Sequence, residues 1–187
     1  MYRLRSVGRW LRRLPERVLH PFRRWRALRA LAAGPPPQSV LVLCLGNICR
    51  SPYAEAVLAA RLDRSSCDVR SAGFIKPGRP SPPEAIAIAA DRGVDLRGHY
   101  SRTVADHVAS ADLVIVMEPG QIGRARKSGV VGRSFLCLGD LDPRPIATRG
   151  IPDPFGRPAQ TYSDSFDRIE RCAAHLLAAS GLDHGVG

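Results

Sequence analysis

Runs of apolar residues, separated by glycine, proline and polar positions, predict four short strands along the chain. The clearest is Asp112–Met117, where five apolar residues follow the aspartate, a pattern typical of a strand buried on both faces. Val40–Leu43 has the same character, and Asp68–Ala72 alternates between polar and apolar positions before Gly73. A fourth strand is expected at Ser134–Leu138.

Between and after these strands, apolar residues recur at helical spacing. Ser81 and Glu84 have the spacing of a capping box, so we expect a helix that begins there and stops at Gly93. The expected helices are Pro52–Arg64, Ser81–Arg92, Val104–Ala109, Gln121–Lys127 and Tyr162–Ala179.

Strands that alternate with helices predict a parallel sheet, because parallel strands need long crossovers that are usually helical. The sequence therefore predicts an α/β fold. We expect a three-layer sandwich with a central four-stranded parallel sheet, helices on both faces and a phosphate-binding loop after the first strand. In such sheets ligands bind beyond the carboxyl ends of the strands, so the residues after Val40–Leu43 are the first place to look for chemistry.

The first 33 residues carry apolar side chains at steps of three and four, which predicts a helical face. Arginines fill much of the opposite side, and Trp10 and Trp25 are suited to a water–lipid interface, as in helices that lie on membranes. Pro15 and Pro21 are expected to break this helix into pieces. Residues 34–37, Gly-Pro-Pro-Pro, indicate a stiff linker. We therefore divide the chain into a basic amphipathic arm with its linker, 1–37, and a globular domain, 38–187.

Charge is concentrated in the arm. Residues 1–37 contain ten arginines and one acid, Glu16, so they carry +9 of the net +11 of the chain. Two interpretations remain open: a basic tail without a partner, or a segment that binds an anionic membrane surface or an acidic partner. An organelle transit peptide is a weaker alternative. Nucleic acid is not expected as a partner, because no recognition fold accompanies the charge.

Five cysteines, an odd number, in a chain without a secretory signal pattern favour a reducing compartment. No apolar stretch is long enough to cross a bilayer. We therefore expect a cytoplasmic protein that meets a membrane only peripherally, through its arm. The cysteines lack the paired spacing of a zinc site, so structural zinc is not expected.

The loop between the first strand and the following helix carries a cysteine, a glycine, and an arginine beside a hydroxyl residue, in the run Cys44-Leu45-Gly46-Asn47-Ile48-Cys49-Arg50-Ser51-Pro52. Backbone N–H groups of such a loop, with the N-terminus of the helix, form an anion-binding concavity. These amides and the neighbouring guanidinium favour the thiolate of Cys44, which makes it a candidate nucleophile. Arg50 can hold two phosphoryl oxygens, and Ser51 can donate its hydroxyl to the thiolate.

This run, followed by Ala54-Glu55-Ala56, resembles the low-molecular-weight protein tyrosine phosphatase family. The resemblance spans about Ser39 to Leu177 and continues through Ser71-Ala72-Gly73, Gly98-His99, Ser101-Arg102 and Asp153-Pro154-Phe155-Gly156. It implies hydrolysis of phosphotyrosine in protein substrates through a cysteinyl-phosphate intermediate, without a cofactor. Residues 1–37 lie outside it.

The resemblance also implies roles for single residues. Asp153 would be the general acid that protonates the leaving oxygen and then activates water, although an aspartate between two prolines is by itself only a common turn signal. Phe155 would form an aromatic wall against the substrate ring. The phosphate-binding loop would comprise Leu45, Gly46, Asn47, Ile48, Cys49 and Ser51, and hydrogen bonds among Asn47, Ser71 and His99 would hold its shape.

Ile48 and Cys49 each allow two interpretations. In the resembling family a bulky branched residue at Ile48 goes with phosphotyrosine, whereas threonine there accompanies phosphoarginine hydrolysis. Cys49 stands five residues from Cys44 and could form a disulfide with it under oxidation, which would protect the nucleophile. Plain packing is the alternative for both.

Three other functions compete with the phosphatase. Arsenate reductase uses the same nucleophile loop, but it commonly needs extra cysteines after the third strand, where this chain has residues 117–121, Met-Glu-Pro-Gly-Gln. A phosphotyrosine-binding scaffold recruited to membranes would not need Cys44, Arg50 and Asp153 together. A thiol hydrolase with His99 as base would leave Arg50 without a role.

Overall fold

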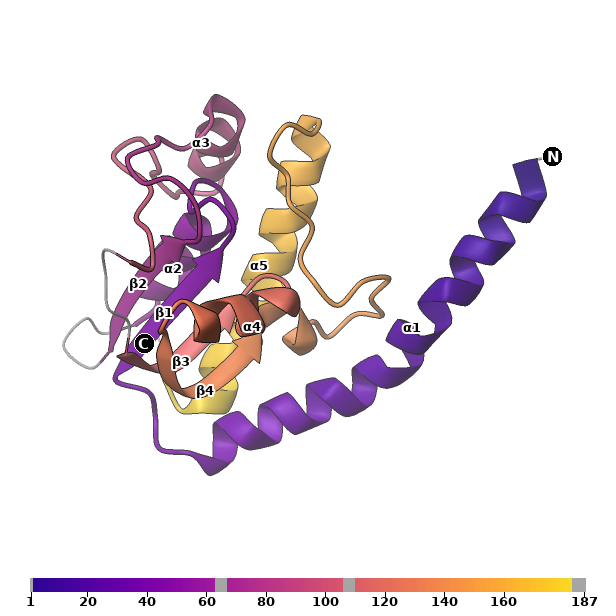
Figure 1. Ribbon diagram of the computed structural model, residues 1–187, viewed down its shortest axis with the longest axis horizontal. Helices are drawn as coiled ribbons and strands as arrows, with labels where there is room; N and C mark the ends of the chain where they lie inside the picture. Colours follow the sequence, from indigo (N-terminus) through magenta and orange to yellow (C-terminus); the bar gives the residue numbers. More distant parts are fainter. Residues whose placement is uncertain (1, 63–66, 106–109, 183–187) are drawn as a thin grey trace.

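The computed structural model describes the backbone of residues 2–62, 67–105 and 110–182, and their side chains from residue 16 onward. Four parallel strands form one sheet in the order β2-β1-β3-β4 (Figure 1). The strands are β1 (Ser39–Cys44), β2 (Asp68–Gly73), β3 (Ser110–Val116) and β4 (Val131–Cys137). The predicted α/β fold with a four-stranded parallel sheet is confirmed.

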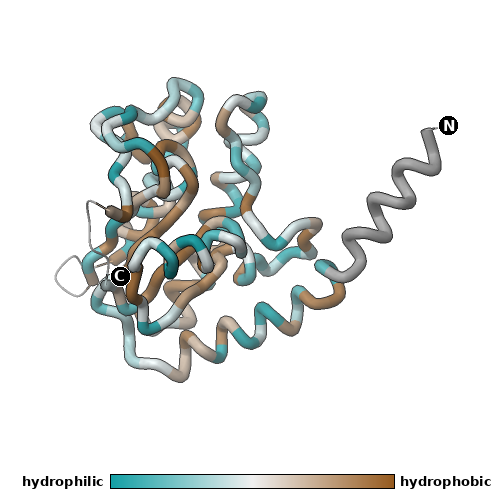
Figure 2. The backbone as a smooth tube through the Cα atoms, viewed as in Figure 1, coloured by the Kyte–Doolittle hydropathy of each residue, from teal (hydrophilic) through white to brown (hydrophobic). Residues whose placement is uncertain are grey.

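Helices cover both faces of the sheet, as the strand pattern predicts. They are α1 (Tyr2–Ala33), α2 (Arg50–Ala59), α3 (Pro83–Ala90), α4 (Gly120–Lys127) and α5 (Ala159–Ser180), with a 3-10 turn, η1 (Leu138–Leu141). Alternate residues of β1 enter two separate cores: Val40 and Val42 pack with α2, α3 and α5, whereas Leu41 and Leu43 pack on the side of α4. Figure 2 shows the apolar strands at the centre of the molecule.

Several predicted boundaries need correction. α2 begins two residues earlier than expected, at Arg50, and ends at Ala59. β4 begins three residues earlier than expected, at Val131. Of the helix expected at 104–109, Val104 and Ala105 form a turn and 106–109 lie outside the described residues.

The capping box predicted for α3 is wrong. Pro82 is the residue that precedes the helix, and no side chain caps it. The Ser81 hydroxyl is buried without a hydrogen-bond partner. Proline fits at a helix start because its missing N–H is one that the first turn leaves unpaired anyway.

α1 is a single helix, so the prediction that Pro15 and Pro21 break it is also wrong (Figure 1). Pro21 cannot donate to the carbonyl of Arg17, but both residues are exposed, so water can satisfy that carbonyl. Three residues on the inner face of α1, Ala27, Leu28 and Leu31, pack against the larger core. Packing of this kind supplies most of the stability of a helix in a protein.

Polar contacts fix the same part of α1 to the body. His20 is 4% exposed, and its Nε2 lies 2.8 Å from the carbonyl oxygen of Asp142. Arg24 donates to the carbonyl of Leu141 and lies 3.3 Å from His175 Nδ1 on α5. The division of the chain at residue 37 stays a prediction, but the second half of α1 is part of the packed body.

Candidate active site

Cys44 is the last residue of β1, so its thiol opens at the carboxyl edge of the sheet. Its sulfur accepts two hydrogen bonds, from the backbone N–H of Asn47 and from the Ser51 hydroxyl, both at 3.1 Å. Donors aimed at sulfur stabilise its negatively charged form. The structure therefore places Cys44 and Ser51 together, as the sequence predicts.

Asn47 holds the loop in its bent shape. Its backbone φ is +51°, a left-handed conformation that asparagine adopts more readily than most residues. Its side-chain amide donates to Ser51 at 2.9 Å and to Ser71 at 2.7 Å, and its side-chain oxygen accepts the N–H of Arg102 at 2.8 Å. The side chain thus ties the loop to β2 and to the segment after His99.

His99 contacts the same asparagine, with Nε2 at 2.7 Å from the Asn47 carbonyl oxygen. Burial lowers the pKa of His99, so the neutral ring donates this hydrogen bond. Asn47, Ser71 and His99 therefore lie together. Sequence reasoning gave no role to Glu55, which accepts from the Ser71 hydroxyl and pairs with Arg102 at 2.8 Å.

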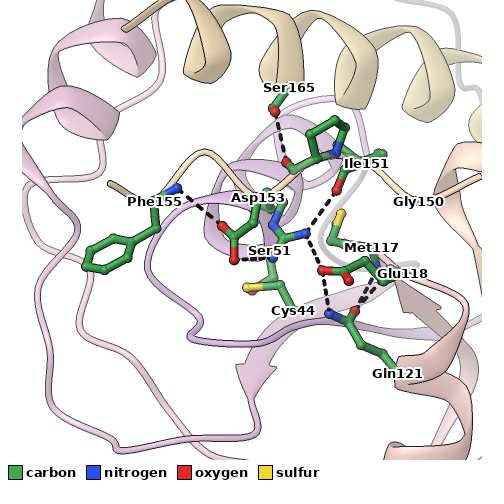
Figure 3. A network of polar contacts seen from close by, with 12 residues as sticks. Cys44, Ser51, Met117, Glu118, Gln121, Gly150, Ile151, Asp153, Phe155 and Ser165 are labelled. Atoms are coloured by element: carbon green, nitrogen blue, oxygen red, sulfur yellow. Dashed lines mark hydrogen bonds and ion pairs between the residues drawn. The ribbon is translucent and has the colours of Figure 1, made fainter. Parts of the chain in front are cut away.

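Arg50 is 1% exposed and has three partners. Its guanidinium donates to Glu118 at 2.8 Å and to the carbonyl of Ile151 at 2.9 Å, and it forms an ion pair with Asp153 at 2.7 Å. A buried guanidinium needs such partners, because burying its charge unpaired costs roughly several kcal/mol of folding free energy. In Figure 3, Cys44 and Asp153 point toward the same region beside these contacts.

Glu118 is a residue of the site that sequence reasoning missed. It follows β3 at the carboxyl edge of the sheet, which is the one sequence signal that could have identified it. Gln121 accepts the backbone N–H groups of Met117 and Glu118 and donates to the Glu118 carboxylate at 3.3 Å. The carboxylate is thereby held toward Arg50 (Figure 3).

The segment that carries Asp153 is held by one contact from α5 and by a local contact of its own. The Ser165 hydroxyl of α5 donates to the carbonyl of Pro152 at 3.0 Å, and the Asp153 carboxylate accepts the N–H of Phe155 at 3.3 Å. The ring of Phe155 is 57% exposed and lies at the outer edge of the site (Figure 3). An exposed ring beside the acid is free to meet an aromatic substrate.

Comparison with known proteins agrees with this geometry. The model of the family "Low molecular weight phosphotyrosine protein phosphatase" matches residues 39–184. The chain belongs to this family. The phosphotyrosine phosphatase function expected from the sequence agrees with that membership.

Known relatives and solved structures align with this chain over nearly their whole length. The low molecular weight protein-tyrosine-phosphatase Wzb of Escherichia coli K12 is 33% identical over 75% of this chain and 94% of its own length. The probable phosphatase EpsP of Ralstonia nicotianae is 31% identical over 72% and 90%. The tyrosine phosphatase AmsI of Erwinia amylovora is 26% identical, covers 76% of this chain and 93% of its own, and superposes with a TM-score of 0.64. The YwlE arginine phosphatase of Geobacillus stearothermophilus is 27% identical, covers 81% and 99%, and has a TM-score of 0.62.

The other residues of the loop after β1 lie partly at the surface and partly in the interior of this phosphatase. Leu45 is 37% exposed, whereas Ile48 and Cys49 belong to the larger core, and Gly46 lies under Arg79, whose guanidinium donates to its carbonyl at 3.0 Å. Burial raises the pKa of the Cys49 thiol, and the nearby Cys44 raises it further. Cys44 and Cys49 are both free thiols in this structure.

Gly73 explains how the loop comes so close to β2. A Cβ atom at this position would lie 2.9 Å from the backbone nitrogen of Asn47 and 3.0 Å from the carbonyl carbon of Gly46. Only glycine allows that approach without a shift of the backbone. Among the described residues, no group of three or more histidine, cysteine, aspartate or glutamate side chains is placed to hold a metal ion.

Proposed function

We propose that this protein hydrolyses phosphotyrosine in proteins, with Cys44 as nucleophile. The observation that carries the proposal is the shared setting of three groups: a sulfur with two hydrogen-bond donors, the buried Arg50, and Asp153 paired with that arginine. The thiolate attacks phosphorus, the bond from phosphorus to the phenolic oxygen breaks, and Asp153 gives that oxygen its proton.

The second half of the reaction uses the same residues. As a carboxylate, Asp153 removes a proton from water, the water oxygen attacks the cysteinyl phosphate, and inorganic phosphate leaves while the Cys44 thiolate is restored. Arg50 and the loop N–H groups hold the phosphoryl oxygens in both steps. No metal or cofactor takes part in this scheme.

Tyrosine-phosphorylated protein is the substrate that the site favours over phosphoarginine. The exposed ring of Phe155 beside Asp153 offers a face for a phenyl group. Ile48 is a bulky branched residue, as in the family members that act on phosphotyrosine. The arginine phosphatase among the structural neighbours makes phosphoarginine the control substrate.

The test is phosphate release from p-nitrophenyl phosphate, phosphotyrosine peptide and phosphoarginine, with a chelator present and vanadate as competitor. We expect chelator-resistant, vanadate-sensitive hydrolysis of the two aryl phosphates, lost in Cys44→Ser by about a thousandfold or more. Retained hydrolysis in Cys44→Ser would remove Cys44 as nucleophile. Inactivity of freshly reduced wild type would favour the reductase or scaffold function, and an arsenate-reduction assay would separate those two.

We also propose that α1 binds an anionic membrane surface, which would hold the enzyme at the membrane peripherally. No helix in the described part of the chain is both long and apolar enough to span a bilayer. Phe22 and Trp25 are 55% and 52% exposed and stack on each other, and Arg26 and Arg29 lie over their rings. Exposed aromatic rings flanked by arginines are typical of helices that lie in a lipid interface.

The test is co-sedimentation with vesicles of phosphatidylglycerol and phosphatidylcholine, compared with phosphatidylcholine alone. Full-length variants are needed, because α1 covers part of the core. We expect Phe22→Ala with Trp25→Ala to weaken binding to the anionic vesicles about tenfold or more. Each lost ring removes apolar area that lipid would bury, which is worth about 1–3 kcal/mol of binding free energy. Equal binding of wild type to both vesicle types would point instead to an acidic protein partner or to no partner.

A further inference from the structure

A groove of about 740 Å³ runs between α1, the segment that follows η1, and the last turns of α5. This volume lies within the roughly 300–1,000 Å³ typical of small-molecule sites. Neither Cys44 nor Asp153 lines this groove. Its lining residues are Arg17, His20, Pro21, Arg24, Trp25, Leu28, Arg29, Ala32, Pro143, Arg144, Pro145, His175, Ala178 and Ala179.

The charge of this lining has one sign. Four arginines contribute to it, and among the described residues that line the groove none is acidic. Arg17 and Arg144 are exposed and form no ion pair among the described residues, so their charge is available to a ligand. The ligand that such a lining favours is an anion.

The groove is cationic at one end and apolar at the other. α1 and α5 run in the same direction here, because Arg24 meets His175 and, further along, Pro36 lies against Gly181. Arg17, Arg24 and Arg144 therefore gather at one end. Leu28, Ala32, Ala178 and Ala179 form the other end, and the fourth arginine, Arg29, lies over the ring of Trp25. A ligand that fits this polarity has an anionic head and an apolar tail.

Trp25 connects the groove with the surface that faces lipid in the proposal above. It lines the groove, and it also stacks on the exposed ring of Phe22. A helix lying in the lipid interface would therefore hold the groove open toward lipid headgroups.

We propose that this groove binds one acidic phospholipid of the membrane, with its phosphate at the arginine end and an acyl chain along the alanine end. The proposal rests on the membrane binding of α1 proposed above, which it makes specific. α1 would then recognise an individual lipid, in addition to the general attraction between basic and acidic surfaces.

The experiment uses dihexanoyl phosphatidylglycerol, a short lipid that dissolves as a monomer, and follows the fluorescence of Trp25 in full-length protein with Trp10→Phe. We expect a saturable change with this lipid and none with dihexanoyl phosphatidylcholine or inorganic phosphate. A response to phosphatidylcholine of equal affinity would overturn the anionic assignment. A response to inorganic phosphate of equal affinity would assign the site to free phosphate.

Two matched pairs of variants locate the site. Arg144→Gln removes a charge from the groove, and Arg61→Gln removes one from an exposed position of the body outside it. Ala178→Phe fills the apolar end, and Ala174→Phe adds the same ring to an exposed position one turn earlier on α5. We expect the groove variants to weaken lipid binding at least fivefold, which corresponds to about 1 kcal/mol. The controls should change it less than twofold.

Equal weakening by the controls, or no saturable response in wild type, would overturn the proposal. Sedimentation of the same variants with anionic vesicles separates this failure from failure of the membrane proposal. Vesicle binding that persists without binding of the short lipid would leave α1 as a general membrane anchor. Neither measurement depends on phosphatase activity.

Discussion

Arg50 is a buried charge that is balanced by two partly exposed carboxylates, those of Glu118 and Asp153. A bound phosphate would offer its own oxygens to the same N–H groups. The pair between Arg50 and Asp153 must then loosen, and the Asp153 carboxyl becomes available to carry a proton. In the proposed mechanism, Arg50 would thus link substrate binding to release of the Asp153 carboxyl.

Asp153→Ala should therefore slow the reaction in a way that depends on the leaving group. We expect kcat/KM, which reports the step that expels the leaving group, to fall about a hundredfold or more with phenyl phosphate, the usual scale of general acid catalysis. The fall should be smaller with p-nitrophenyl phosphate, because its phenolate leaves without a proton. The measurement is kcat/KM across a series of aryl phosphates, with Asp164→Ala, an exposed acid on α5, as control. The same fall for every leaving group would contradict the assignment.

His99 gives a prediction about pH. Its pKa is lower in the folded protein than its ordinary value of about 6.5, so the unfolded chain binds the proton more readily. Stability should therefore decline as pH falls below about 6.5, because protonation of the ring favours the unfolded state. In His99→Gln the side-chain amide can still donate to Asn47. The free energy of unfolding of this variant, measured by urea denaturation, should decline less between pH 7.5 and 5.5 than that of wild type. Parallel pH profiles of stability in wild type and His99→Gln would show that other groups cause the decline.

At the residue scale, the sequence predicted what lies within one short run. Cys44, Asn47, Arg50 and Ser51 are neighbours in the chain, so their chemistry is visible as a motif. Glu118 reaches Arg50 across 68 residues, and no local pattern reveals that contact. The partners of a buried charge are set by tertiary packing, which one sequence does not display.

The segment between η1 and α5 owes its course to Arg168, a residue of α5 that is 8% exposed. Arg168 donates to the carbonyls of Gly150 at 2.9 Å and Thr148 at 3.0 Å, and it pairs with Asp142 at 2.9 Å. Ile151, the next residue along, accepts from Arg50. The helix thereby fixes the segment just before the proposed acid.

Arg168→Gln should loosen this segment without touching the thiol. We expect kcat for phenyl phosphate to fall about tenfold, since loss of a positioning contact shifts Asp153 from its productive geometry. Inhibition by vanadate should change little. Arg171→Gln is the control, because Arg171 also pairs with Asp142 but, within the described part of the chain, forms no hydrogen bond or ion pair with residues 148–151. An equal fall in both variants, or one independent of the leaving group, would contradict this role.

α1 gives the other prediction at this scale. Leu28 packs against the larger core, so Leu28→Ala should cost about 1–3 kcal/mol of unfolding free energy. Val18 is 66% exposed on the same helix, and Val18→Ala should change stability by less than about 0.5 kcal/mol. Urea denaturation of the two variants checks this, and equal stabilities would mean that α1 is not docked in solution.

The elements were predicted better than their contacts. Val40–Leu43 is apolar throughout and Asp112–Met117 is apolar after its aspartate, so burial of these strands on both faces was evident. The continuity of α1 past Pro21 was not evident from the sequence, because it depends on packing of Ala27, Leu28 and Leu31 against distant residues. An amphipathic pattern shows that a helix has an apolar face, but not which surface covers it.

At the scale of the whole molecule, charge and catalysis lie at different places. The basic segment 1–37 holds +9 of the net +11, and it meets the body at η1 and at the last turns of α5. The proposed acid lies before the same helix, whose second and third turns carry Ser165 and Arg168, and these two residues hold its segment. One helix therefore has the basic surface near one end and the catalytic residues near the other (Figure 1).

α5 has 22 residues, which makes it about 33 Å long at 1.5 Å per residue. Because α1 and α5 run in the same direction, this length would extend mainly along the membrane when α1 lies on lipid. An enzyme seated on lipid through α1 would therefore carry its catalytic residues to one side of the lipid that its groove holds. Substrates would then be selected by their place beside the bound lipid as well as by their local sequence.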